Sequence, residues 1–194
     1  MVAPFNFKNE AFIFGTSTTE VFENIGGSGF PFQRNGLILD KGLVAPLSVA
    51  KASGTFMFIG AGRDESPAIW AFQGNDYTKV SNTGIDLLLN ALSETEMADV
   101  NGFSYAQDGS YFVGWSLPNE TILYDTITTK WHLRRSEVAD VAGNFMSVGW
   151  RSTQQVTAYA KLITFDTQDG RVGEISRDFH DEYGQEILRE FDPL

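Results

Sequence analysis

The stretch YDTITTKW, residues 124–131, lies between two short runs of strand-forming residues. Asp125 stands where the first run ends, and its carboxylate can accept hydrogen bonds from the backbone of the turn that follows. Thr128 can do the same with its hydroxyl group. Tyr124 and Trp131 supply large rings, and a Trp at this place can pack between neighbouring sheets. We expect these four residues to be structural.

The strands around this stretch occur twice. Residues 48–81 and 102–135 each contain four short strand-like runs, and Gly54 and Gly109 occupy the same turn in the two sets. Shorter sets are predicted at 11–24 and 144–176. Four strands per unit, repeated about every 50 residues, are typical of propeller blades. The Tyr-Asp-x-x-Thr-x-x-Trp spacing is that of kelch-like blades, without the Gly-Gly doublet of true kelch repeats.

The predicted fold is therefore mainly β, with β-propeller-like blades of four antiparallel strands in an incomplete ring. An antiparallel sandwich with aromatic strands is the alternative. We expect residues 1–194 to form one propeller-like domain that is part of a larger propeller. A propeller needs about four to eight blades, and the predicted sets fall short of a full ring.

One segment departs from the strand pattern. Residues 83–97 place apolar side chains at helical spacing, at Ile85, Leu88, Leu89 and Leu92. Thr83 and Asp86 have the spacing of a capping box. We expect a single inserted amphipathic helix over 83–97, and a loop-rich section over 26–46.

Composition excludes several classes of protein. The 194 residues contain 25 acidic and 14 basic side chains, a net charge of −11, which argues against sequence-specific nucleic-acid binding. The absence of cysteine excludes disulfides and thiolate sites. Residues 1–10 lack the pattern of a signal peptide, and no apolar run approaches the ~20 residues of a membrane span.

Motifs for catalysis or ligand binding are weak. Residues 60–62 read Gly-Ala-Gly, but no helix is expected after them, so a dinucleotide site is not predicted. Residues 166–170 lack the alternating ligands of a calcium loop. His132 and His180 fall in different sets, without the spacing of a zinc site. We predict no catalytic residue, no metal and no cofactor.

The segment Phe30-Pro-Phe32-Gln-Arg34 stands out within the loop-rich section. Exposed aromatic rings beside an arginine are typical of protein-contact surfaces. Phe30, Phe32 and Arg34 are therefore the candidate partner-contact residues. In the alternative, the two rings fold back and cover the core below the loop.

Taken in order, several motifs resemble a known family. They are Phe14-Gly-Thr-x-Thr-x-Glu-Val-Phe22, Pro31-Phe-x-Arg34, Gly42, Ser48-Val-Ala50, Phe58-Ile-Gly60, Lys79-Val-Ser81, Ile85-Asp86 and the 124–131 stretch. This order resembles the packaged-DNA stabilisation proteins of short-tailed bacteriophages, also called tail accessory or hub proteins. The resemblance covers roughly residues 11–190.

The resemblance implies a structural virion protein of the phage tail, built largely as a β-propeller and assembled in the bacterial cytoplasm. Such a protein docks beneath the portal and its adaptor ring, closes the channel after packaging and retains the DNA. Its implied partners are the portal and adaptor proteins, the tail needle, the tailspikes and further copies of itself. No catalytic residue is carried over. Members of the family are typically longer, so a fragment is one interpretation of this chain.

Two other functions stay open from the residues alone. Propeller glycosidases place paired carboxylates near the propeller axis, and this chain has acidic residues at 64–65, 94–99 and 181–182. A binding propeller outside viruses is the other alternative. The helix 83–97 and the loop 26–46 are further candidates for partner contacts.

Overall fold

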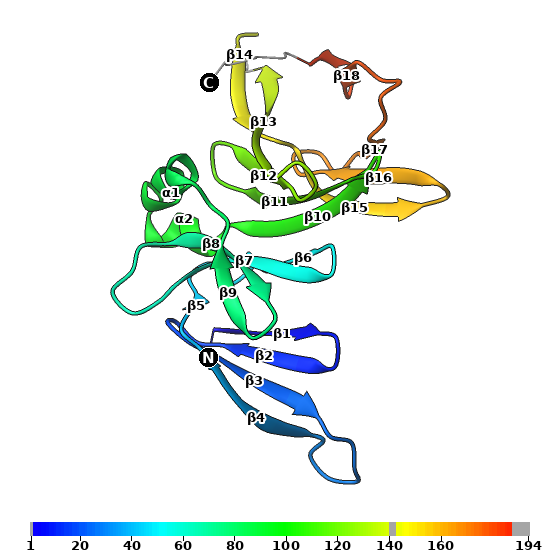
Figure 1. Cartoon of the computed structure of the whole chain (residues 1–194). Helices are drawn as coiled ribbons and strands as arrows, with labels where there is room; N and C mark the ends of the chain where they lie inside the picture. Colours follow the sequence, from blue (N-terminus) through cyan, green and yellow to red (C-terminus); the bar gives the residue numbers. More distant parts are fainter. Residues whose placement is uncertain (1, 140–142, 188–194) are drawn as a thin grey trace. The chain divides into compact units, whose positions relative to one another are not determined.

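The computed structural model describes residues 2–139 and 143–187. The described chain is mainly β and consists of antiparallel blade-like sheets, as the sequence predicts (Figure 1). It divides into two compact units, Met1–Phe103 and Ser104–Leu194, each of which is described by itself.

The first sheet of the first unit has four strands in chain order. They are β1 (Ala3–Phe7), β2 (Glu10–Phe14), β3 (Thr19–Asn24) and β4 (Phe32–Leu39). The prediction of a loop over 26–46 is wrong for β4 and for the short β5 (Gly42–Leu43). β4 is the edge strand of its sheet, and its exposed residues from Gln33 to Gly36 give it no alternation of apolar and polar side chains.

The second sheet contains the strands that the sequence predicts between residues 48 and 81. Besides β5 it consists of β6 (Ala50–Ala52), β7 (Thr55–Ala61), β8 (Ala68–Gln73) and β9 (Asp76–Lys79). Both β5 and β6 pair with β7, one after the other along its length. Gly54 turns the chain between β6 and β7 with a φ of 76°.

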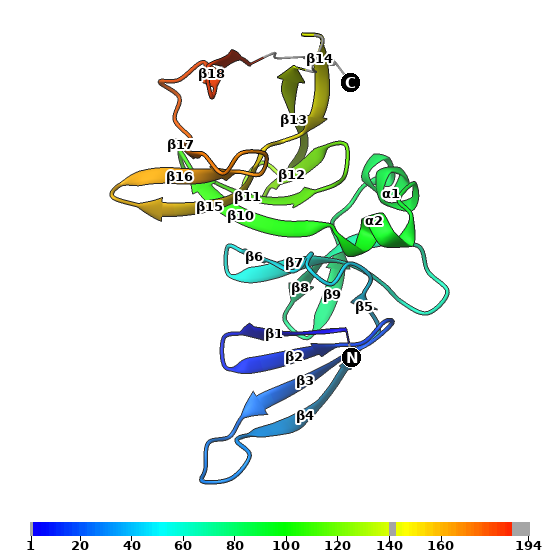
Figure 2. The ribbon, with the colours of Figure 1, turned by 180° about the vertical axis from the view of Figure 1, so that it is seen from behind.

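An aromatic core joins these two sheets. The ring of Phe56 on β7 lies 4.9 Å from that of Phe12 on β2 and 5.2 Å from that of Phe72 on β8. Phe14 lies 5.0 Å from Phe58 in the same way. Phe12, Phe14, Phe56 and Phe58 are all fully buried. The N-terminal sheet is thus packed on the second sheet through edge-on and tilted aromatic pairs, and Figure 2 shows the two sheets from behind.

The helical segment consists of two helices instead of one over 83–97. α1 spans Thr83–Asn90 and α2 spans Glu94–Ala98. Ser93 starts α2 with a complete capping box, in which Ser93 and Glu96 bond each other's backbone N–H groups. The cap of α1 is Asn82, whose side chain accepts from Ile85 N, one residue before the predicted Thr83. Apolar spacing continues across both helices, so it does not reveal the interruption.

The second unit begins within β10. Its larger sheet runs in chain order through β10 (Asn101–Gln107), β11 (Ser110–Ser116), β12 (Thr121–Asp125), β13 (Lys130–Ala139) and β14 (Phe145–Gly149). Asp108 and Gly109, at the turn predicted around Gly109, both have positive φ, 51° and 84°, as a tight two-residue hairpin turn requires.

The remaining strands of the second unit form two smaller sheets. They are β15 (Ser152–Ala158), β16 (Lys161–Asp166) and β17 (Val172–Glu174), followed by the hairpin of β18 (Asp181–Glu182) and β19 (Gln185–Glu186). The polar sequence of β15 gave no strand signal. Its pairing with β16 includes a register shift between Ser152 and Gln154.

Candidate partner-docking surface

The loop that joins β3 to β4 carries the two predicted contact rings. Phe30 is 80% exposed, and its ring centre lies 6.0 Å from that of Phe32, which is half-buried. Ile25, also exposed, donates its backbone N–H to Pro31 O and closes the base of the loop. Phe30 therefore does not fold back onto the core, and an apolar surface is presented at the end of the hairpin.

Arg34 lies on the strand behind these rings. Its guanidinium is 2.8 Å from the Glu20 carboxylate and 5.7 Å from the centre of the Phe22 ring. Phe22 and Arg34 are register partners across β3 and β4. Because Glu20 neutralises Arg34 in part, the surface consists of an apolar loop end and a paired, exposed charge next to it. We name the exposed residues Ile25, Phe30 and Arg34, together with the half-buried Phe32, the hairpin surface.

The four residues of the 124–131 stretch have structural contacts. Asp125 Oδ1 accepts from the backbone N–H of Ile127 at 2.8 Å and of Thr128 at 3.3 Å, and Thr128 Oγ1 donates to Asp125 Oδ2 at 2.9 Å. Burial raises the pKa of Asp125, but these hydrogen bonds more than offset it, so its pKa lies below the ordinary value. Trp131 contacts two rings of its own sheet, Tyr124 at 4.9 Å and Trp115 at 6.0 Å between ring centres.

The same turn recurs at Asp166, which the sequence analysis did not select. Asp166 ends β16, and its Oδ1 accepts from Gln168 N at 2.9 Å, as Asp125 does from Ile127. Both aspartates are followed by threonine, in YDT and FDT, and that repeat was the available signal. A carboxylate at the end of a strand thus organises the following turn in the β10–β14 sheet and in the β15–β17 sheet.

A buried ionic cluster surrounds Asp166. Arg151 Nε donates to Asp166 Oδ1 at 3.0 Å, and the guanidinium makes a second contact with Oδ2. Arg171 Nε lies 2.7 Å from Asp169 Oδ2. The Tyr183 ring lies 5.3 Å from the guanidinium of Arg151 and 4.6 Å from that of Arg171. These contacts hold the β18–β19 hairpin against the smaller sheet, which is a structural role.

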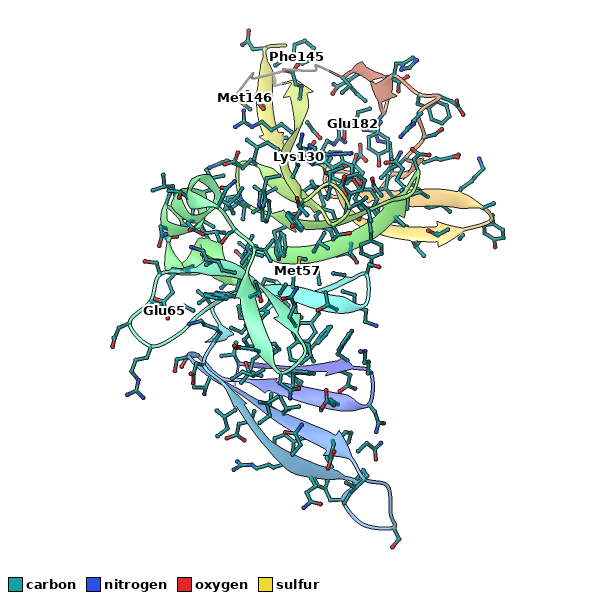
Figure 3. All side chains as sticks on the ribbon, viewed as in Figure 1. Met57, Glu65, Lys130, Phe145, Met146 and Glu182 are labelled. Carbon is teal, nitrogen blue, oxygen red and sulfur yellow. The ribbon has the colours of Figure 1, made fainter. Side chains whose placement is uncertain are left out.

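Glu182, labelled in Figure 3, has a carboxyl group whose pKa is raised above its ordinary value. Burial is the main cause, and the negative charge of Asp166 adds to it; hydrogen bonds to the side chains of Ser136 and Trp150 and the charge of Arg151 act in the opposite direction. A raised pKa is one requirement of a general acid. Glu182 does not, however, line either of two hollows formed by residues 106–178 of the described chain.

The carboxylates of the more polar hollow are mostly paired with cations. Arg177 Nε is 2.7 Å from Asp108 Oδ2, and Lys161 Nζ is 2.6 Å from Glu174 Oε2. The other hollow has no acidic side chain in its lining. In the 64–65 pair, a hydrogen bond from Lys41 and one from Gly62 N lower the pKa of Glu65. Among the described residues that line these two hollows, no acid–base pair of the kind that glycoside hydrolysis needs is therefore found.

Within residues 2–139 and 143–187, no group of three or more His, Asp or Glu side chains could hold a metal ion. His132 is exposed on β13, with its ring 6.4 Å from that of Phe112, and His180 is exposed before β18. No helix of the described chain is long and apolar enough to cross a membrane.

Comparison with known families agrees with the blade-like sheets. The family model described as "Bacteriophage P22 Gp10, beta-propeller" matches residues 1–180. The chain belongs to this family. It is a family of phage structural proteins that stabilise packaged DNA, and it confirms the resemblance deduced from the sequence motifs. Among curated proteins no sequence matches the chain.

Proposed function

We propose that this chain is a non-enzymatic component of a phage tail hub that docks beneath the portal and adaptor ring, closes the channel after packaging and retains the DNA. The observation that carries the proposal is the family match over residues 1–180. Its partners are the portal and adaptor proteins, the tail needle, the tailspikes and further copies of the chain. It assembles in the cytoplasm of the host bacterium.

The hairpin surface is the proposed contact with a partner. Exposed aromatic side chains beside an arginine are over-represented where proteins bind each other, because they bury a large area for a small loss of conformational freedom. Phe30 and Phe32 offer such rings at the end of a hairpin whose strands are fixed by the aromatic core. A rigid base with an exposed apolar end suits docking.

The net charge of −11 supports a role beside DNA rather than on it. A strongly acidic surface repels the phosphate backbone, so a strand can pass without sticking. Retention of DNA would then come from steric closure of the channel.

The test uses DNA-filled phage heads that lack their closure proteins. Purified chain is mixed with the heads, which are sedimented and scored for bound chain and for DNA leakage. Binding with reduced leakage is the expected result. Failure of the folded chain to bind would contradict the proposal.

A matched pair of variants locates the contact. Deletion of residues 28–34 removes the hairpin end and should weaken binding. Tyr159→Ser removes a ring that is equally exposed, on the β15–β16 turn, and should leave binding unchanged. Equal binding of the deletion variant and the full chain would exclude the hairpin surface as the contact.

A further inference from the structure

The outer edge of β14 has no partner strand within residues 2–139 and 143–187. β14 is the last strand of its sheet, and no other described strand pairs with its outer side. Phe145 is 63% exposed and Met146 is 53% exposed, and Figure 3 labels both on this strand. An edge strand of this kind presents free backbone N–H and C=O groups next to apolar side chains, which favours pairing with another strand.

The edge strand β4 of the first sheet is blunted, whereas β14 is not. β4, the edge of the first sheet, carries Arg34, is interrupted by Gly36 with a φ of 86°, and follows Pro31. Charges, irregular backbone and proline are the usual devices against edge-to-edge pairing. Residues 143–149, in contrast, read GNFMSVG and contain neither charge nor proline, in a chain whose net charge is −11.

The sequence of β14 is complementary to itself. In an antiparallel pair of two copies with Ser147 opposite Ser147, Met146 lies opposite Val148 and Phe145 opposite Gly149. Opposite residues share a face of the sheet, so each apolar side chain meets an apolar or a small one. This register uses all five residues of the strand. No charged group of β14 opposes its own copy.

We infer that β14 is a self-association edge, through which two copies of the chain pair antiparallel about a two-fold axis at Ser147. The occupant of the edge is thus a second copy of this chain. Five paired residues bury less area than a standard interface of about 1,600 Å², so the isolated dimer is weak and depends on concentration. This inference does not rest on the proposed docking to phage heads.

The first test uses a single cysteine, since the chain has none of its own. In the two-fold register the Cα atoms at 147 lie about 4.5–5.5 Å apart, within reach of a disulfide. Ser147→Cys should form a covalent dimer under mild oxidation at micromolar concentration. Ser53→Cys, the same substitution at an exposed turn in the first unit, should stay monomeric. Equal cross-linking of both variants, or of neither, would overturn the inference.

The second test separates pairing from misfolding. Ser147→Lys and Ser147→Glu each place like charges opposite each other and should weaken self-association about tenfold or more, measured by sedimentation velocity. An equimolar mixture of the two folded variants should restore the dimer. A wild-type chain that stays monomeric up to millimolar concentration, as it would if another segment of the same chain covered the edge, would refute the two-fold pairing. No phage heads are used, so the result is independent of the docking assay.

Discussion

Arg151 and Asp166 form an ion pair that is almost completely buried, with side chains 6% and 0% exposed. Arg151 directly precedes β15, and Asp166 ends β16, so the pair ties the start of the β15–β17 sheet to the turn between β16 and β17. Loss of one partner leaves a charge that water cannot reach, and this is more costly than loss of the pair as a whole.

Asp166→Ala should therefore destabilise the second unit strongly. We expect the free energy of unfolding to fall by about 3–5 kcal/mol, because the guanidinium of Arg151 loses its buried partner. Urea titration followed by near-UV circular dichroism measures the change. Asp169→Ala, which removes a half-exposed carboxylate from the same cluster, should have a much smaller effect. Similar losses in the two variants would contradict the buried pair.

Asp125 should make stability depend on pH in the acidic range. Its pKa is lowered in the folded chain, so its contribution is complete above the unfolded value of about 3.9 and is lost as the pH falls through the folded value. The advantage of the wild type over Asp125→Asn in free energy of unfolding should therefore be constant from about pH 5 to about pH 7 and shrink below about pH 4. Urea midpoints of the two proteins across this range provide the measurement. A difference between them that stays constant well below about pH 4 would contradict a lowered pKa of Asp125.

Glu182 should act with the opposite sign. Its raised pKa means that the folded chain binds the proton more tightly than the unfolded chain does, so this group favours folding at low pH and loses that benefit as the pH rises. Glu182→Gln keeps a neutral side chain at every pH. It should be more stable than the wild type near neutral pH, and the gain should disappear near the unfolded pKa of about 4.3. Thermal unfolding at several pH values tests this, and a gain that is independent of pH would disprove the assignment.

A methyl group at Gly60 should be poorly tolerated. A Cβ atom there would collide with the backbone oxygen of Gly42 on β5 and with the buried ring of Phe58. Gly60→Ala should lower the free energy of unfolding by about 1–3 kcal/mol, as overpacking does. Gly29→Ala, where a Cβ atom meets no other atom within 4 Å, is the matched control. Equal stability of the two variants, measured by thermal unfolding, would show that β5 and β7 can separate at no cost.

Substitutions at two phenylalanines of the first unit should affect docking and stability separately. Phe30→Ser changes an exposed ring and should alter the free energy of unfolding by less than about 0.5 kcal/mol while weakening binding to phage heads. Phe12→Ala empties a fully buried position and should cost about 3–5 kcal/mol. Unfolding curves and head co-sedimentation give the two readings. Unchanged binding of Phe30→Ser to phage heads would show that the Phe30 ring is not part of the contact.

Local sequence signals predicted the strands that alternate or end at clear turns. The sets predicted at 48–81 and 102–135 correspond to β6–β9 and β10–β13, and Gly54 and Gly109 turn the chain with positive φ. β4 and β15 were missed because an exposed or polar strand is held by its neighbours rather than by its own pattern. The interruption between α1 and α2 depends on the Ser93 cap, which apolar spacing does not reveal.

The candidate site was predictable only where a local sequence signal marks it. Phe30 and Phe32 were selected because aromatic rings in a loop are unusual, and the structure places them together at an exposed hairpin end. The cluster around Asp166 was not found, since Arg151 and Tyr183 come to it from distant parts of the sequence through sheet register. Long-range pairing of this kind has no local signal.

The aromatic core shared by β1–β4 and β5–β9 also determines where the first unit can be cut. A break after Asp40, between the two sheets, would leave Phe12 and Phe14 on one fragment and Phe56 and Phe58 on the other, each with a water-exposed aromatic face. Neither fragment would keep its own interior. In protease digestion and in gene rearrangement, the two N-terminal sheets should therefore survive or be lost together, as one exchangeable module.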